Sequence, residues 1–177
     1  TILIDGIDIA QIDPADLRKG ISYVPQDIHL FGGTIKQNIL GIHKFIDDEW
    51  MLECSKMSGT DEFVRMHPAG YDMPLGERGA GLSGGQRQSV GIARALINNS
   101  DIWMFDEPTN AMDQTSESIV LNNLMSKIEG KTLLLVTQKM SMVDLVDRII
   151  VMNFGTKVLD GPKDEIINKL GNSGEKQ

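Results

Sequence analysis

Short apolar runs alternate with helical patterns along most of this chain. The runs cover residues 21–24, 102–106, 132–137 and 148–152, and a short strand and turn is predicted over residues 1–6. Apolar runs separated by helices are typical of a parallel sheet that is covered on both faces. The pattern therefore predicts an α/β fold.

The segment between the apolar runs at 21–24 and 102–106 is predicted to be mostly helical. Helices are expected over residues 34–40, with Thr34 as N-cap, over residues 47–57 and over residues 60–66. In the second helix, one face carries Trp50, Met51, Cys54 and Met57. Residues 68–81 are rich in glycine and proline and predict a loop. A further helix begins at Ser83, with an apolar stripe of Val90, Ala93, Leu96 and Ile97.

The C-terminal part is predicted to contain a helix over residues 114–128, the strand at 132–137, a short helix, a hairpin and a last helix. Asn153-Phe154-Gly155 turns the strand at 148–152 into an antiparallel partner at 157–160. Pro162 is expected to start the terminal helix. Residues 172–177 are polar and predict a disordered tail.

Composition narrows the class of protein. The 177 residues suit a single domain, and no apolar run approaches the roughly 20 residues that span a bilayer, so the chain itself is expected to be soluble. A net charge of −8 argues against a nucleic-acid partner. Cys54 is the single cysteine, so it forms no internal disulfide and fits a core position in a reducing, cytoplasmic setting. Because the sequence opens directly on a strand, we expect it to be cut from a longer protein.

One candidate phosphate-binding element is the run Leu82-Ser83-Gly84-Gly85-Gln86. Two glycines let the backbone approach a ligand closely, and a helix start offers free N–H groups and a positive dipole. The alternative is an ordinary glycine-bearing helix cap.

A second element favours the phosphate interpretation. The apolar strand at residues 102–105 ends in Asp106-Glu107, and α/β sheets bind ligands at the carboxyl ends of their strands. An aspartate there can hold magnesium, and an adjacent glutamate can orient and partly deprotonate a water. The alternative is a strand that simply runs into a Pro-Thr-Asn turn. Together the two elements indicate a nucleoside triphosphatase.

The glycine-rich phosphate loop Gly-x-x-x-x-Gly-Lys-Ser/Thr does not occur in these residues. Gly130-Lys131-Thr132 is a partial match, but Met125 stands at the earlier glycine position and the order is helix then strand. We interpret Gly130 as a helix stop. The chain therefore carries about half of an ATP site.

These motifs together resemble the ATP-binding cassette (ABC) nucleotide-binding domain over nearly the whole chain. The resemblance implies an incomplete P-loop NTPase core with a helical subdomain and a C-terminal β-hairpin plus helix. It also implies a signature motif (Ser83, Gly84, Gly85, Gln86) that contacts ATP held by a partner domain. Asp106 matches the Walker B aspartate that holds Mg²⁺, and Glu107 the catalytic glutamate. Asn110–Asp113 matches the D-loop, and Gln26 the Q-loop ligand of magnesium and water.

The same resemblance implies partners and a location. A second nucleotide-binding domain would close the ATP site, and a transmembrane domain would contact the Gln26 and Glu77 regions, at the cytoplasmic face of the inner or plasma membrane. By the resemblance, residues 1–26 and 99–171 are the partial ATPase core, and residues 27–98 the helical subdomain. Phe31, followed by Thr34-Ile35 and Asn38-Ile39, resembles exporters. Residues 147–152 and 160–165 are most similar to type I secretion transporters of toxins, adhesins or bacteriocins.

One departure from the family pattern lies after the strand at 132–137, where Gln138 stands in place of the usual histidine. Glutamine can donate a hydrogen bond to a γ-phosphate but cannot become cationic near neutral pH. The alternative to a catalytic exporter domain is therefore a non-catalytic ABC-like interaction module. A soluble ABC protein of repair or translation is a third option. His29, His43 and His67 lie in predicted loops and are given no catalytic role.

Overall fold

The computed structural model describes residues 1–43 and 45–174, which form two compact units rather than the single domain that the length suggested. The first unit comprises residues 1–137 and the second begins at Gln138. Each unit is described by itself. The predicted division into residues 1–26 with 99–171, and residues 27–98, stays a prediction.

The first unit contains six helices of the α type and seven short strands among its described residues. In chain order they are β1 (Leu3–Ile4), β2 (Ile7–Asp8), α1 (Pro14–Lys19), β3 (Ile21–Val24), β4 (Gly33–Thr34), α2 (Ile35–Leu40), α3 (Asp48–Met57), α4 (Thr60–Val64), β5 (Pro74–Leu75), α5 (Gly84–Leu96), β6 (Ile102–Asp106), α6 (Gln114–Met125) and β7 (Thr132–Val136). Three 3₁₀ turns lie at Ile9–Gln11, Gly70–Asp72 and Glu77–Gly79.

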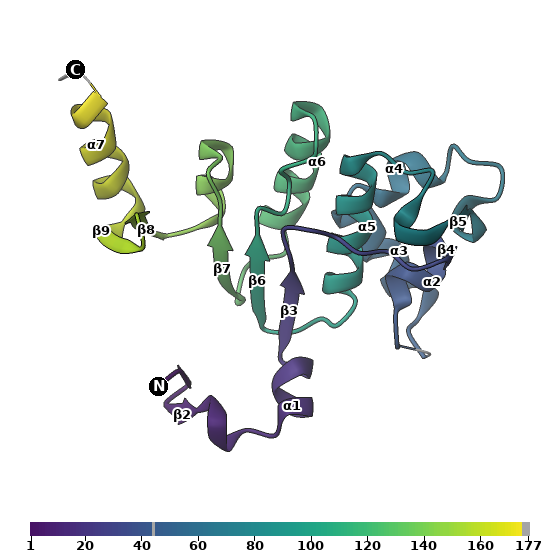
Figure 1. Ribbon diagram of the computed structural model, residues 1–177, viewed down its shortest axis with the longest axis horizontal. Helices are drawn as coiled ribbons and strands as arrows, with labels where there is room; N and C mark the ends of the chain where they lie inside the picture. The colour runs from purple at the N-terminus through teal and green to yellow at the C-terminus, as the bar shows by residue number, and fades with distance from the viewer. Residues whose placement is uncertain (44, 175–177) are drawn as a thin grey trace. The chain divides into compact units, whose positions relative to one another are not determined.

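The central feature of this unit is a parallel sheet with strand order β3-β6-β7. Figure 1 shows the three arrows side by side and pointing the same way. Val24 pairs with Phe105, and Asp106 pairs with Val136, so the carboxyl ends of all three strands reach one edge of the sheet. The strands predicted from the apolar runs are confirmed, and so is the rejection of Gly130-Lys131-Thr132 as a phosphate loop, because Thr132 begins β7.

The two faces of the sheet differ in exposure. One face carries Ser22, Val24, Trp103 and Phe105, all at most 4% exposed, and the rings of Trp103 and Phe105 stack with centroids 5.6 Å apart. On the other face, Tyr23, Met104 and Leu134 pair across the three strands as one row. Tyr23 and Leu134 are 56% and 53% exposed. Since parallel sheets normally bury both faces, this row is an apolar surface suited to a further protein layer.

Helix α5 holds the helical part of the unit together. Its Arg94 donates from Nε to the carbonyl of Asn38 at 2.7 Å, and from the guanidinium to the carbonyl of His29 at 2.9 Å. The same guanidinium lies over the Phe31 ring, 5.5 Å from its centroid. Burial lowers the pKa of Arg94, yet the group stays charged because an arginine pKa lies far above neutrality. These contacts tie α2 and the segment after β3 to α5.

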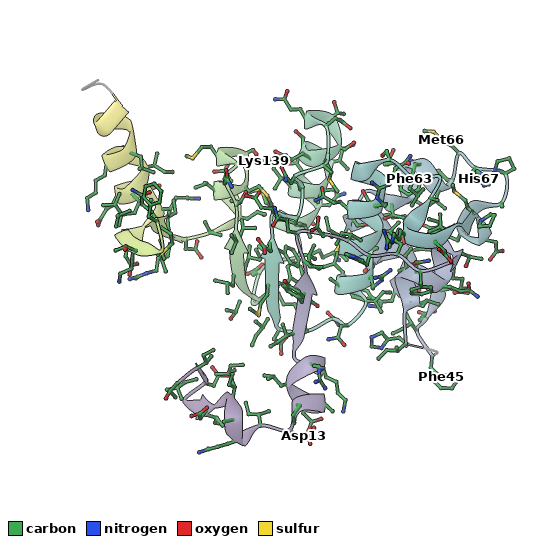
Figure 2. All side chains as sticks on the ribbon, in the orientation of Figure 1. Asp13, Phe45, Phe63, Met66, His67 and Lys139 are labelled. Carbon is green, nitrogen blue, oxygen red and sulfur yellow. The ribbon has the colours of Figure 1, made fainter. Side chains whose placement is uncertain are left out.

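Helix α3 confirms the predicted apolar face. Asp47 caps its start, and Met51, Cys54 and Met57 are buried. Cys54 is fully buried, so its predicted core position is confirmed, and burial raises the pKa of its thiol to about 12. By contrast, Phe45 after α2 and Met66 after α4 project from their loops (Figure 2), at 98% and 78% exposed.

The second unit contains the 3₁₀ turn Met140–Leu145, strands β8 (Arg148–Asn153) and β9 (Thr156–Pro162), and helix α7 (Lys163–Gly174). The predicted antiparallel hairpin is confirmed. Pro162 does not start the helix, because it pairs with Arg148 as the last residue of β9. Residues 172–174 are helical rather than part of a disordered tail; the rest of that predicted tail, residues 175–177, lies outside the described residues.

Helix α6 is shorter than predicted. Helix α6 ends at Met125 instead of residue 128, because the Lys127 N–H donates back to the Leu124 carbonyl at 2.9 Å and the chain reverses at Gly130, where φ is 77°.

None of the helices in the described residues combines the length and the apolar character that crossing a bilayer requires.

Candidate nucleotide-binding site

The carboxyl edge of the sheet gathers several of the predicted site residues. Gln26 follows β3 and is exposed, Asp106 ends β6, and Thr137 follows β7. Neighbouring parallel strands end at the same edge, so these residues come from adjacent positions of one edge, where α/β sheets bind ligands. The sequence pattern predicted the position of Asp106 at a strand end, and the family resemblance suggested Gln26.

Glu107 has the most constrained backbone in this region. Its φ is 46°, a left-handed conformation that costs on the order of 1–3 kcal/mol for a residue other than glycine. Its N–H donates to the Val136 carbonyl at 2.9 Å, and Thr137 Oγ1 donates to its Oε2 at 3.4 Å. The residue is only 8% exposed. A buried carboxylate is thus held at the strand end by the neighbouring strand.

The predicted signature motif begins α5 with a capping box. Ser83 Oγ accepts from the Gln86 N–H at 3.1 Å, and Gln86 Oε1 accepts from the Ser83 N–H at 2.9 Å. The side chains of both residues are therefore already engaged in fixing the helix start. Ser83 remains exposed, so its hydroxyl can also reach a ligand outside this chain.

Gly84 and Gly85 allow the loop after β6 to approach the helix start closely. A Cβ at Gly85 would lie 3.1 Å from the Ala111 carbonyl oxygen and 3.3 Å from Met112 Cα, and one at Gly84 would lie 3.1 Å from Ala111 Cβ. All three distances are shorter than ordinary van der Waals contacts. The two glycines therefore have a packing role within the chain, in addition to the ligand contact that the sequence suggested.

Gln88 is the site residue that the sequence reasoning missed. Its side chain is 4% exposed and spans the turn after β6, donating from Nε2 to the Glu107 carbonyl at 3.2 Å and accepting from the Ala111 N–H at 2.7 Å. It is therefore a positioning residue between α5 and the backbone that carries Glu107. The available signal was its polar side chain on the buried side of an amphipathic helix, since buried polar groups are normally paired.

Asp113 is the N-cap of α6. Its Oδ1 accepts from the N–H groups of Thr115 and Ser116 at 3.0 Å, and its Oδ2 accepts from Ser116 Oγ at 2.7 Å. The hydrogen bonds from the Ser116 N–H and hydroxyl lower the pKa of Asp113. The end of the predicted D-loop is thereby fixed to the start of a helix.

The loop around Glu77 packs against the segment after Gln26 and against the start of α5. A Cβ at Gly79 would lie 3.0 Å from Leu30 Cδ1 and 3.1 Å from Arg87 Cδ, and Arg87 in turn donates to the Leu82 carbonyl at 2.7 Å. Glu77 itself is exposed. This loop therefore touches the segment after Gln26 and the first turn of α5.

Gln138 is the first residue of the second unit and directly follows Thr137. No group of three or more histidine, cysteine, aspartate or glutamate side chains within the described residues is arranged to hold a metal ion.

The fold and the strand-edge site together define a P-loop NTPase of the ABC type, and the comparisons agree. The family profile "ABC transporter" matches residues 1–110, so the chain belongs to this family. The chain is 42% identical over 166 residues to "Leukotoxin translocation ATP-binding protein LktB" of a Pasteurella haemolytica-like species (strain 5943B) and, equally, to that of Mannheimia glucosida. The match covers 94% of this chain and 23% of each relative, so the chain spans about a quarter of their length.

A solved structure, "Structure of a bacterial Atm1-family ABC exporter with ATP bound", superposes with a TM-score of 0.88 and 33% identity. The superposition covers 94% of this chain and 30% of the exporter chain. The predicted fold class and the predicted ABC family are both confirmed.

Proposed function

We propose that this chain is the ATP-binding and hydrolysing part of an ABC exporter. The observation that supports this most strongly is Glu107, which is buried in a left-handed conformation directly after Asp106 at the carboxyl edge of a parallel sheet. Strained backbone that the surrounding structure holds in place is found preferentially at functional sites. A simple turn after a strand would not need a buried carboxylate at this position.

In this proposal Glu107 accepts a hydrogen bond from the attacking water and takes on part of its proton. The Thr137 hydroxyl, 3.4 Å from Oε2, orients the carboxylate, and Gln88 fixes the backbone beneath it. Ser83 and the two glycines close over the γ-phosphate of an ATP bound by a second nucleotide-binding domain. Gln138 donates a neutral hydrogen bond where the family usually has histidine.

Mg²⁺ is the proposed cofactor beside ATP, with Asp106 and Gln26 as its protein ligands. Both residues supply oxygen atoms from adjacent strand ends, the donor type that magnesium prefers. When bound, the ion neutralises charge on the phosphates. The Gly-x-x-x-x-Gly-Lys-Ser/Thr loop that holds those phosphates does not occur in these residues and must be contributed from outside them.

The proposed setting is an integral membrane transporter, at the cytoplasmic face of the inner or plasma membrane. Its transmembrane domain would contact the Gln26 and Glu77 regions, which are both exposed. The names of the relatives, which concern leukotoxin translocation, support export of a protein or peptide of the type I secretion kind. The acidic net charge of −8 supports the exclusion of nucleic acid as a partner.

The test is ATP turnover in a longer protein that joins this chain to the missing phosphate loop. Glu107→Gln should lower turnover by about 100-fold or more and leave ATP affinity nearly unchanged, since a general base contributes this much to the chemical step. Glu129→Gln, on an exposed glutamate after α6, is the matched control and should have no effect. Unchanged turnover in Glu107→Gln would contradict the proposal.

A second candidate is a non-catalytic ABC-like module that docks to a partner. Gln138 in place of histidine and the phosphate loop missing from these residues favour it. Under either candidate function, residues 1–177 alone should release no phosphate from ATP. Without residues that position the ATP phosphates, most of the rate enhancement that comes from orienting the reacting groups is lost. The longer protein separates them: Mg²⁺-dependent turnover that Glu107→Gln removes supports the catalytic function, and full ATP binding without turnover supports the docking module.

A further inference from the structure

A buried carboxylate on helix α6 contacts the loop that follows Glu107. Glu117 lies in the first turn of α6 and is 7% exposed. Its Oε2 accepts a hydrogen bond from the Thr109 hydroxyl at 2.9 Å, and Thr109 is 1% exposed. An acidic side chain at a helix start is ordinarily a solvent-exposed contribution to helix stability. Because glutamate is seldom buried unless it is paired, the contact with Thr109 indicates a role beyond the helix itself.

Thr109 is closely connected to the backbone of Glu107. Only Pro108 separates the two residues, and its ring fixes its own φ at about −65°. The Glu107 carbonyl accepts from the Asn110 N–H at 3.1 Å, and this bond closes a turn that contains Thr109. The Thr109 carbonyl accepts from the Met112 N–H at 3.0 Å, which closes a second turn. Since Thr109 belongs to both turns, a displacement of its side chain changes the backbone that carries Glu107.

The loop is thus held from two helices at different residues. Gln88 on α5 bonds the Glu107 carbonyl and the Ala111 N–H, whereas Glu117 on α6 bonds the Thr109 hydroxyl. The φ of 46° at Glu107 is a conformation that persists only where the surrounding structure determines it. We propose that Glu117 is a positioning residue, which fixes Thr109 and thereby keeps the Glu107 carboxylate aimed at the attacking water. This inference rests on the proposed ATP-hydrolysing function, and it gives Glu117 no contact with ATP.

The test is ATP turnover in the longer protein that supplies the phosphate loop. Thr109→Val removes the hydroxyl and nearly keeps the shape of the side chain. It should lower kcat about tenfold, because a misplaced general base loses part of a contribution of about 100-fold or more. ATP affinity should stay nearly unchanged, since neither Thr109 nor Glu117 is proposed to touch ATP. Thr109→Ser keeps the hydroxyl and should restore most of kcat.

Thr60→Val is the matched control. Thr60, the first residue of α4, is 0% exposed, and its hydroxyl lies 2.8 Å from the Ser58 hydroxyl. The control therefore removes a hydrogen-bonded hydroxyl that is as well buried as that of Thr109. It should lower the free energy of unfolding by a similar amount and leave kcat unchanged. If both Thr→Val variants lower kcat alike, the loss comes from general destabilisation and the proposal is overturned.

Two combined variants test whether the effect passes through this contact and through Glu107. Glu117→Met removes the acceptor, so adding Thr109→Val to it should lower kcat no further, because both changes remove the same bond. In a Glu107→Gln background, Thr109→Val should leave the residual turnover unchanged, since no base is left to position. An additive loss in either combination overturns the proposal. If Glu107→Gln lowers turnover but Thr109→Val does not, only this inference is overturned; if Glu107→Gln itself has no effect, the proposed function is overturned with it.

Discussion

Replacing Gln88 with methionine removes one buried and one partly buried hydrogen bond and keeps the length of the side chain. The Ala111 N–H loses its acceptor at 2.7 Å, and because Ala111 is exposed this loss costs about 1 kcal/mol, the low end for an unpaired donor. The Glu107 carbonyl loses the Gln88 donor at 3.2 Å but still accepts from the Asn110 N–H at 3.1 Å. That second loss is accordingly small, on the order of 0.5 kcal/mol. Gln88→Met should therefore lower the free energy of unfolding of the first unit by roughly 1.5 kcal/mol.

The assay is urea unfolding followed by tryptophan fluorescence, because Trp50 and Trp103 both lie in the first unit. With a urea dependence of about 2 kcal/mol per molar, a loss of that size lowers the urea midpoint by about 0.75 M. Amide hydrogen exchange gives a local measurement: the Ala111 N–H should exchange faster in the variant, whereas amides in the middle of β6 should change less.

Gln86→Met is the matched control. It is the same substitution on the same helix, but Gln86 is only partly buried and its side chain accepts one hydrogen bond, from the Ser83 N–H at 2.9 Å. Losing this half of the capping box should cost about 1 kcal/mol or less. If Gln88→Met costs no more than Gln86→Met, Gln88 does not hold the turn that carries Glu107, and the positioning role assigned to it is wrong.

Three further predictions follow from other parts of the chain. The pKa of Asp113 is lowered in the folded state. Its carboxylate therefore stabilises the fold fully above the unfolded pKa of about 3.9, and this stabilisation is lost as the pH falls through the lower folded pKa. Asp113→Asn, which keeps an N-cap acceptor, should make the free energy of unfolding less dependent on pH over that window. The exposed apolar row that contains Tyr23 and Leu134 should make the chain self-associate in sedimentation, and Leu134→Lys should reduce that self-association. Unchanged self-association would mean that this face is not the contact. In the longer protein, Gln138→His should raise turnover by up to roughly 100-fold with ATP affinity nearly unchanged, since it restores a charge-assisted donor; equal or lower turnover would show that glutamine suffices there.

The elements that local pattern determines were predictable from the sequence. Thr34, Asp47 and Ser83 were each placed at a helix start, and all three cap the helix that follows. The strands at residues 21–24, 102–106 and 132–136 were found because continuous apolar runs bounded by helices leave few alternatives. The ends of the elements were predicted less well. Pro162 was expected to start the last helix, but it ends β9 because it pairs with Arg148, a contact that the local sequence does not reveal.

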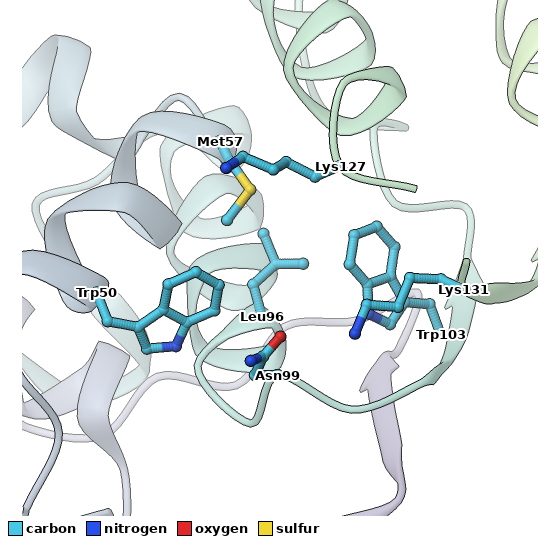
Figure 3. Close-up of a pocket in the computed structure, with 7 residues that line it drawn as sticks. All are labelled: Trp50, Met57, Leu96, Asn99, Trp103, Lys127 and Lys131. Carbon is cyan, nitrogen blue, oxygen red and sulfur yellow. The ribbon is translucent and has the colours of Figure 1, made fainter. Parts of the chain in front are cut away.

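Features that depend on contacts between distant residues could not be predicted. Gln88 binds backbone groups of residues 107 and 111, which lie about one strand and one loop further along the chain. The left-handed φ of Glu107 contradicts the local preference of glutamate and exists because neighbouring strands hold it. The pocket between Trp50 and Trp103, which Figure 3 shows, likewise needs α3 and β6 to be in place before it exists.

The predicted signature motif forms the start of α5, and it contacts the loop that follows Glu107 in two ways. Gly84 and Gly85 permit the close approach of Ala111 and Met112, and Gln88 bonds the backbone on both sides of that loop. Packing alone would allow the loop to slide along the helix, and hydrogen bonds alone would allow it to swing outward. Since both act on the same few residues, a rigid displacement of the helix start must carry the Glu107 backbone with it. In the proposed exporter, closure of a second nucleotide-binding domain over Ser83 should therefore also move the backbone of Glu107 in the chain that supplies Ser83.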